Sequence, residues 1–173
     1  MVTIIAGTNR PNSSTFKVAR YYQKTLLSKG LEAGVLSLIE LPDTLIVSDL
    51  YGKRSAAFAA IQQRVSATDK FIFIIPEYNG SFPGVLKTFI DACTFPDSFY
   101  EKKAALVGIS SGKYGNIRGV DHFTGICNYI HLHVMPLKIH ITNIKNELNA
   151  DGDLINADTI AFTDEQMNKF ITF

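Results

Sequence analysis

The sequence runs Pro-Glu-Tyr-Asn-Gly-Ser-Phe-Pro-Gly-Val-Leu-Lys-Thr-Phe-Ile-Asp from Pro76 to Asp91, directly after the apolar run Phe71–Ile75. A continuous, β-rich apolar run is typical of a buried parallel strand, and the segment after it has the pattern of a turn and then a helix. The turn therefore lies at the carboxyl end of a strand, where open α/β sheets bind ligands. Tyr78 offers a ring face, and Asn79–Ser81 offer hydrogen bonds with little bulk. These residues suit a flat ring with polar edges, although an ordinary strand-to-helix turn has the same pattern.

A second strand, loop and helix stand at the start of the chain. Val2–Ala6 has a buried-strand pattern, and the apolar positions from Ser14 to Ser28 indicate a helix. The loop between them has one arginine, no acid and four hydroxyl side chains: Thr8, Ser13, Ser14 and Thr15. The amides of the helix start favour an anion, and the hydroxyls and Arg10 can donate to its oxygens. The loop predicts a phosphate site, with a plain helix cap at Ser13 or Ser14 as the alternative.

The first loop lacks a Walker A motif and a GxGxxG motif, which disfavours a triphosphate or an ordinary dinucleotide at this position.

A third unit of strand, loop and helix follows later in the chain. Ala104–Ile109 is the strand, residues 110–118 form a loop of small residues, and a helix is expected from about Ile117 to His131. Three polar loops thus follow three candidate central strands, and they should meet at one edge of the sheet as a single composite site.

The remaining segments continue the alternation of strands and helices. We expect a strand at 31–38, a loop at 40–54, helices at 55–68 and 82–95, a fifth strand at 133–140 and a short last helix capped by Thr163. Alternation of this kind predicts an α/β fold with a parallel sheet and right-handed crossovers. Strand order 2-1-3-4-5, with helices on both faces, gives a three-layer domain that spans residues 1–173.

The three loops together resemble those of the NADPH-dependent FMN reductase family, which includes chromate- and quinone-reducing enzymes and some azoreductases. The similarity runs from about residue 2 to residue 140 and is most specific in the stretch Pro76–Lys87. It departs from the family pattern at Thr8, where Ser is usual, at Thr15, where Asn is usual, and at Asn116, where the family has a second glycine. The chain also has Ala92 where the family often has Trp.

The resemblance implies a flavodoxin-like fold that holds FMN at the carboxyl edge of a five-stranded sheet. On this mapping the phosphate is surrounded by Thr8, Arg10, Ser13, Ser14 and Thr15. The isoalloxazine ring would lie along Pro76, Glu77, Tyr78, Asn79, Gly80 and Ser81, and its other side would be closed by Ser110, Ser111, Gly112 and Gly115. Tyr78 and Asn79 would shape the substrate face, and Arg118 either contacts the phosphate of NAD(P)H or forms a structural ion pair.

The activity that the resemblance implies is hydride transfer from NADPH or NADH to bound FMN, and then to a small acceptor in ping-pong order. The acceptor would be a quinone, free flavin, an azo compound or a metal oxyanion. Because the cofactor carries this chemistry, no side chain is expected to be catalytic. Two alternatives stay open, a flavodoxin-type electron carrier that NAD(P)H does not reduce directly and a flavin-free binding module on the same fold.

The resemblance further implies a homodimer or homotetramer whose subunits border the flavin. Phe95, Phe99 and Tyr100 are candidates for the interface, and packing in the core is the competing explanation. Cys93 and Cys127 have no CxxC spacing and are expected to be reduced packing residues.

Charge and composition narrow the classes of function. The net charge is +1 and the basic residues are dispersed, which disfavours nucleic acid as a partner. The same near-neutral balance disfavours a dedicated electron carrier, for which an acidic surface is expected. No apolar stretch reaches the roughly 20 residues of a membrane span, and the chain enters a strand at once, so we expect a cytoplasmic protein with no membrane partner. The four histidines lack metal-ligand spacing, so no metal site is expected, and no hydrolase motif is present.

Overall fold

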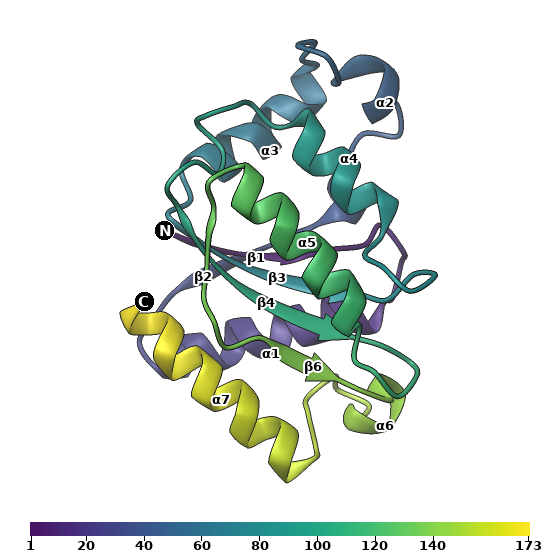
Figure 1. The fold of residues 1–173 in the computed structure, drawn as a ribbon, viewed down its shortest axis with the longest axis vertical. Coiled ribbons are helices and arrows are strands. Elements are labelled where there is room, and N and C mark those ends of the chain that lie inside the picture. Colours follow the sequence, from purple (N-terminus) through teal and green to yellow (C-terminus); the bar gives the residue numbers. More distant parts are fainter.

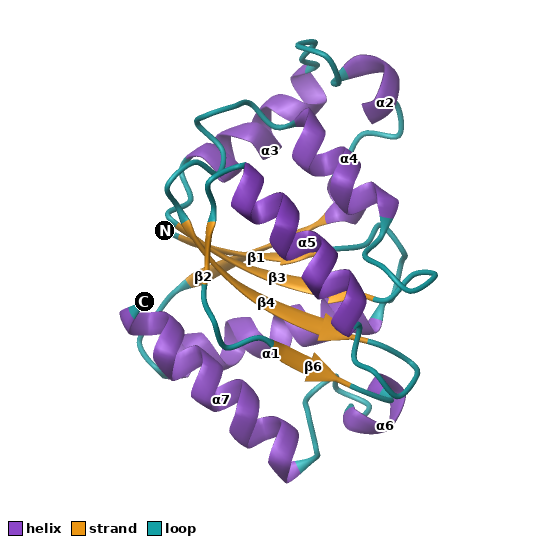
Figure 2. Ribbon diagram, in the orientation of Figure 1, coloured by secondary structure: helices purple, strands orange, loops and turns teal.

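A parallel sheet forms the middle layer of the computed structural model, which describes residues 1–173 (Figures 1 and 2). The strand order is β2-β1-β3-β4-β5, and a further strand, β6, also pairs with β4. All pairings between these strands are parallel. In chain order the elements are β1 (Val2–Ala6), α1 (Ser14–Ser28), β2 (Ala33–Ser37), the 3₁₀ helix η1 (Leu38–Glu40), α2 (Leu45–Ser48), α3 (Ala56–Ser66), β3 (Lys70–Pro76), α4 (Gly84–Ala92), β4 (Lys103–Ile109), α5 (Ile117–Tyr129), β5 (His133–Val134), β6 (Ile139–Ile141), α6 (Ile144–Glu147) and α7 (Ala157–Thr172).

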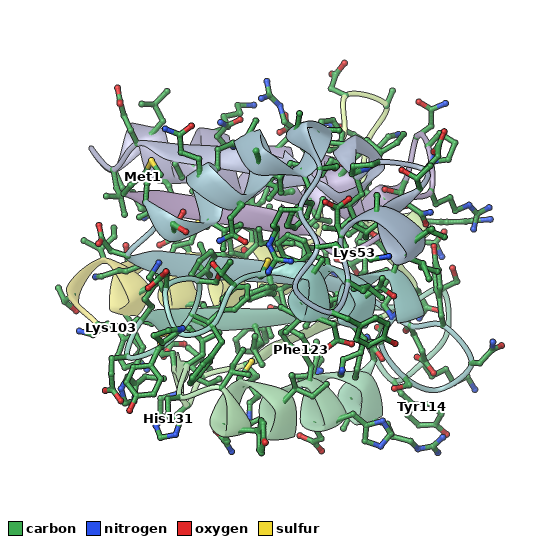
Figure 3. All side chains as sticks on the ribbon, turned by 90° about the horizontal axis from the view of Figure 1, so that it is seen from above. Met1, Lys53, Lys103, Tyr114, Phe123 and His131 are labelled. Atoms are coloured by element: carbon green, nitrogen blue, oxygen red, sulfur yellow. The ribbon has the colours of Figure 1, made fainter.

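Two hydrophobic cores lie on the two faces of the sheet, because successive side chains of a strand point to opposite faces. Ile72 and Ile74 of β3 belong to the core that contains side chains of α1 and α7. Phe71 and Phe73 belong to the core that contains side chains of α3, α4 and α5. Figure 3 shows Phe123 directed from α5 toward the sheet, and its ring centroid lies 5.0 Å from that of Phe73. The central strands are thus buried on both sides, which explains why they are continuous apolar runs.

The predicted α/β class, the strand order and the helices on both faces are confirmed, and the first helix has the predicted bounds. The fifth strand was expected to be continuous over residues 133–140, which is wrong. Two short pieces, β5 and β6, pair with the two ends of β4, and residues 135–138 separate them. Pro136 lies in this gap. Proline has no N–H for a sheet ladder, so it interrupts the edge strand.

The start of the last helix was also placed wrongly. Helix α7 begins at Ala157, and Asn156 caps it by accepting from the amides of Asp158 and Thr159. Thr163 lies inside this helix, buried, and its hydroxyl donates to the carbonyl oxygens of Thr159 and Ile160. A threonine that bonds back to the preceding turn is compatible with a helix interior, so its position in the sequence resembled a cap without being one.

The segment 40–54 was expected to be a loop, but it contains the helix α2. Asp49, fully buried, anchors the end of this segment to the start of α3. Its carboxylate accepts from the hydroxyl of Ser48 at 2.6 Å and from the hydroxyl of Ser55 at 2.9 Å. Ser55 in turn caps α3 by accepting from the amide of Phe58.

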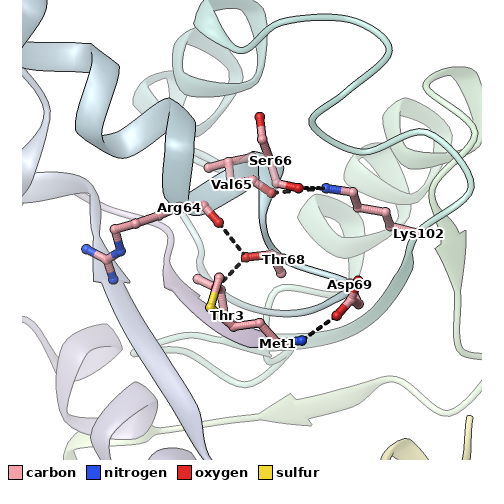
Figure 4. A network of polar contacts seen from close by, with 8 residues as sticks. All are labelled: Met1, Thr3, Arg64, Val65, Ser66, Thr68, Asp69 and Lys102. Atoms are coloured by element: carbon pink, nitrogen blue, oxygen red, sulfur yellow. Dashed lines mark hydrogen bonds and ion pairs between the residues drawn. The ribbon is translucent and has the colours of Figure 1, made fainter.

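A polar network closes the amino-terminal edge of the sheet (Figure 4). The terminal amine of Met1 pairs with Asp69, and the hydroxyls of Thr3 and Thr68 are joined at 2.6 Å. Lys102 donates to the carbonyl oxygens of Val65 and Ser66 at the end of α3. The two hydrogen bonds of Lys102 satisfy backbone carbonyls at the end of α3.

The aromatic residues proposed for an interface take different places. Phe99 is buried in the core with Phe71, so core packing explains it. Phe95 is 71% exposed, and Tyr100 is 40% exposed and stacks on His131 at 4.6 Å between ring centroids. Of the three candidates, Phe95 and Tyr100 therefore remain available for contact with another subunit.

Both cysteines are free and buried, as predicted. Burial raises the pKa of the Cys93 thiol and of the Cys127 thiol to about 12. Because the thiolate is the reactive form, we expect neither thiol to react with a disulfide reagent such as dithionitrobenzoate in the folded protein at mildly alkaline pH. Both should react after unfolding in guanidinium chloride. Rapid labelling of either thiol in the folded state would contradict the packing described above.

Candidate functional site

A cavity of about 650 Å³ opens at the carboxyl-terminal edge of the sheet, where the loops after β1, β3 and β4 meet. This volume is in the range of sites for small molecules and cofactors. The sequence-predicted residues that line it are Arg10, Ser13, Ser14, Thr15, Pro76, Glu77, Tyr78, Asn79, Ser110 and Ser111. The three loops that the sequence assigned to one composite site therefore do enclose one space.

The first loop presents the start of α1 to the cavity. The hydroxyl oxygen of Ser13 caps the helix by accepting from the amide of Phe16 at 3.2 Å, which leaves the hydroxyl hydrogen of Ser13 to donate. The amides of Ser14 and Thr15 have no acceptor within the chain. Arg10 forms no ion pair. Unpaired amides, hydroxyls and a free guanidinium at one helix start form an arrangement that suits a phosphate.

Gly7 sets the path of this loop. Its amide donates to the carbonyl oxygen of Ile74 at 2.9 Å, and a Cβ on Gly7 would lie 2.9 Å from the same oxygen. The chain can leave β1 this close to β3 only without a side chain. The close approach brings the first loop beside the loop that follows β3.

The second loop is a tight turn over Tyr78–Ser81. The amides and carbonyls of Tyr78 and Ser81 exchange two hydrogen bonds of 2.9 and 3.1 Å. Asn79 and Gly80 both have positive φ, 52° and 77°. Positive φ at both central positions defines a type I′ turn, for which Asn-Gly is the preferred sequence. The Asn-Gly pair is therefore explained by backbone conformation, and within the turn only Tyr78 and Asn79 line the cavity.

Tyr78 joins the second loop to the first. Its hydroxyl is hydrogen-bonded to Oγ1 of Thr8 at 2.7 Å, and the same oxygen accepts from the amide of Arg10 at 3.2 Å. Thr8 is almost fully buried and does not line the cavity. In this structure Thr8 therefore orients Tyr78 and the backbone of Arg10 rather than facing the cavity itself.

Gly80 and Ser81 lie on the side of the turn that faces α5. Ser81 Oγ and His122 Nδ1 are hydrogen-bonded at 2.9 Å, and the guanidinium of Arg118 lies beside Gly80. Neither Gly80 nor Ser81 lines the cavity, and neither does Arg118. Arg118 forms no ion pair either, so the structural pairing that the sequence left open for it is absent.

The third loop is held by its own polar groups. The hydroxyl of Ser110 donates to the carbonyl of Gly112 and accepts from the amide of Gly115, both at 3.0 Å. The Nδ1–H of His140 on β6 donates to the carbonyl of Gly115 at 3.1 Å. Gly112 and Gly115 do not line the cavity, whereas Ser111 lines it with an exposed side chain. Tyr114, at the tip of this loop, stands out from the molecule (Figure 3).

Asn116 stands where the family that the sequence resembles has a glycine, and the backbone conformation explains why Asn is tolerated there. Its φ of 60° is left-handed, a conformation that Asn tolerates better than other side chains. The side-chain Nδ2 of Asn116 donates to the backbone carbonyl of Ile75 at 3.0 Å and so ties the third loop to β3. Its Oδ1 is buried against Gly119, where a Cβ would overlap it. Asn116 thus adopts a backbone conformation that glycine also allows, and it adds a bond between the third loop and β3.

Five lining residues had not been predicted, namely Pro11, Asn12, Ile109, Ile144 and Lys145. Pro11 and Asn12 belong to the first loop, and Ile109 ends β4. Ile144 and Lys145 come from α6, after the last strand. No local pattern marked α6 as part of the site, because its place there follows from the pairing of β6 with β4.

Comparison with protein families identifies the family of the chain. The model of the NADPH-dependent FMN reductase family matches residues 1–146, a range that includes every loop around the cavity. The chain belongs to the NADPH-dependent FMN reductase family. The resemblance predicted from the sequence is confirmed, and the family is one of flavin-dependent oxidoreductases, in agreement with the expected FMN and NAD(P)H.

Individual relatives are moderately similar to this chain. The chain is 29% identical over 115 residues to a 2-hydroxy-1,4-benzoquinone reductase of Burkholderia sp, and the alignment covers 64% of this chain and 63% of that protein. It is 30% identical over 115 residues to an FMN-dependent NADPH-azoreductase of Staphylococcus aureus, with 63% of this chain and 60% of that protein covered. The chain thus spans less than two thirds of the length of these two relatives.

A solved structure agrees over nearly the whole length. The flavoenzyme NAD(P)H:(acceptor) oxidoreductase FerB from Paracoccus denitrificans superposes with a TM-score of 0.83 at 25% identity, covering 99% of this chain and 94% of that chain. The predicted flavodoxin-like fold is confirmed by this likeness.

No group of three or more His, Cys, Asp and Glu side chains is arranged to hold a metal ion. None of the helices combines the length and apolar character needed to cross a bilayer.

Proposed function

We propose that this chain is an FMN-dependent NAD(P)H oxidoreductase that passes electrons to small acceptors. The end of the cavity formed by the loop after β1 supports the proposal most strongly. Two unpaired amides, those of Ser14 and Thr15, lie there beside the free guanidinium of Arg10, and Tyr78 lines the same space. A mononucleotide with one terminal phosphate and a flat ring fits both ends of this arrangement.

The residues present are chemically suited to FMN. Arg10, the hydroxyl of Ser13 and the amides at the start of α1 would bind the phosphate. Residues 76–79 and the loop at 110–111 would hold the ring, as the sequence resemblance implied. Thr8 and Ser110 would support FMN binding indirectly. The hydroxyl of Thr8 orients Tyr78, and the hydroxyl of Ser110 holds the third loop. The remaining predicted residues, Gly80, Ser81, Gly112 and Gly115, would set the backbone of the two loops.

FMN, when bound, supplies the redox chemistry by accepting hydride from NADPH or NADH and releasing it to an acceptor in a separate, ping-pong half-reaction. The protein would bind the phosphate and orient the ring. Asn79 is exposed and Arg118 is exposed without an ion pair, so both are available to a dinucleotide or an acceptor. No catalytic side chain is proposed.

The named relatives support quinones and azo compounds as the acceptor class, because one relative is a benzoquinone reductase and another an azoreductase. Free flavin and metal oxyanions belong to the same proposal. We further propose a cytoplasmic homodimer or homotetramer. The exposed Phe95 and Tyr100 support an additional subunit contact.

Initial rates of NADPH and NADH oxidation test the proposed activity. With added FMN and a benzoquinone, the rate should depend on both, and double-reciprocal plots at several quinone concentrations should be parallel. Omission of FMN should abolish the reaction. Retention of FMN without any oxidation of NADPH or NADH would favour an electron carrier reduced by a partner protein, and a chain that does not bind FMN would be a flavin-free module.

A further inference from the structure

Lys145 lines the cavity together with Arg10 and the start of α1, although it follows Arg10 by more than a hundred residues. It lies on α6, the four-residue helix after β6. The sequence motifs that indicated a phosphate site lie in the first loop alone, so they do not account for a lysine at this wall. Its position has to be explained by the tertiary structure.

Two backbone hydrogen bonds fix the segment that carries Lys145. The amide of Asn143 donates to the carbonyl of Gly112, and the amide of Ile144 donates to the carbonyl of Ser110, both at 2.9 Å. The side chain of Ile144 is buried, with 4% of its surface exposed. Lys145 is therefore attached to the third loop of the site, and only its side chain is free to move.

No acidic side chain neutralises Lys145. It forms no ion pair, and neither does Arg10. Glu147, two residues further along α6, is too close in sequence to face Lys145 on a helix, and its Oε1 accepts from Asn156. Glu77 is the one acidic residue in the cavity lining, and it comes from the loop after β3.

A phosphate monoester carries a charge of about −1.5 to −2 near neutral pH, more than one arginine can balance. Two unpaired cations and two unpaired amides line one cavity with a single carboxylate. We propose that Lys145 is a second cationic ligand of the cofactor phosphate, so that this chain discriminates FMN from the phosphate-free riboflavin by two charges rather than one. This inference rests on the proposed FMN-dependent function.

The test compares the affinities of FMN and riboflavin, measured by quenching of flavin fluorescence, in the wild type and in Lys145→Met. Methionine keeps much of the length of the side chain and removes its charge. The Kd of FMN should rise about fivefold to tenfold, a range that reflects an exposed charge pair strengthened by hydrogen bonding to phosphate. The Kd of riboflavin should be unchanged, and the FMN affinity of the variant should depend less on ionic strength than that of the wild type.

Lys53→Met is the matched control, because Lys53 is an exposed lysine in the loop before α3 and does not line the cavity. It removes the same charge from the chain and should leave the Kd of FMN unchanged. Equal FMN affinity in the wild type and in Lys145→Met would overturn the inference while leaving the proposed function intact. Equal weakening of FMN and riboflavin would also overturn it, since the loss would then not involve the phosphate. A wild type that binds no FMN would overturn both.

Discussion

Arg10→Ala is expected to weaken FMN binding by about 1–3 kcal/mol, the range for a lost charge-assisted contact to a phosphate. This corresponds to roughly a fivefold to 150-fold rise in Kd. Arg10 lines the cavity beside the unpaired amides of α1 and has no carboxylate partner, so its removal breaks no ion pair within the protein. Calorimetric or fluorescence titration of the apoprotein with FMN measures the change directly.

Arg20→Ala provides the control, because Arg20 lies on the exposed surface of α1, where it donates to Gln23 and not to the cavity. Its FMN affinity should match that of the wild type. Ser13→Ala is expected to weaken FMN binding as well, but Ser13 also caps α1, so this variant should lose about 1 kcal/mol of stability in addition. Unchanged FMN affinity in both Arg10→Ala and Ser13→Ala would refute the phosphate assignment.

Gly108→Ala is expected to lower the free energy of unfolding by roughly 2–3 kcal/mol, the upper part of the range for overpacking in a core. A Cβ at Gly108 would overlap the carbonyl oxygen of Gly115 and would lie 2.8 Å from Cγ2 of Val120 and 3.1 Å from Nδ1 of His140. The backbone of the third loop would have to move away from β4. The midpoint of thermal unfolding should fall by about 5–10 °C, as expected for a domain of this size, and the FMN affinity should fall with it.

Gly125→Ala separates this effect from the general cost of replacing a glycine. Gly125 lies on α5, and a Cβ there would meet open space. Alanine is a better helix former than glycine, so this variant should be more stable than the wild type by about 0.5–1 kcal/mol. A thermal midpoint for Gly108→Ala that equals that of the wild type would show that the close packing of β4 against the third loop is wrong.

The central sheet could be predicted from the sequence because its strands are buried on both faces. Phe71–Ile75 and Ala104–Ile109 are continuous apolar runs, and the polar loops after them mark one edge of the sheet. The last strand was harder to predict, because it lies at the edge of the sheet and pairs on one side only, with β4. The break around Pro136 divides the last strand into β5 and β6. The apolar residues on either side suggested one continuous strand, and Pro136 itself was the signal of the break.

The sequence predicted most of the residues that line the cavity, but not which of their polar groups are used in hydrogen bonds within the protein. Asn79 and Gly80 were predicted to lie along the ring, and their positive φ angles show that the type I′ turn itself also requires them. The hydroxyl of Ser110 is used within its own loop, and Thr8 bonds Tyr78. A sequence shows that a side chain can donate a hydrogen bond, and only the folded structure shows whether another group of the protein has already accepted it.

The second cation of the cavity could not be predicted at all. Lys145 reaches the site because β6 pairs with β4 and because residues 143–144 bond to the third loop. These contacts connect segments about thirty residues apart, and no periodicity or motif in residues 142–148 records them. Lys145 therefore had the appearance of an ordinary surface lysine.

An anaerobic titration of the FMN-loaded protein with NADPH and with NADH, followed by visible absorption, shows whether the chain is an NAD(P)H oxidoreductase. FMN should stay bound after removal of the excess, its visible bands should bleach on addition of one or both nucleotides, and they should return when a quinone is added. Visible bands that persist in the presence of excess NADPH and NADH would contradict the assignment as an NAD(P)H oxidoreductase.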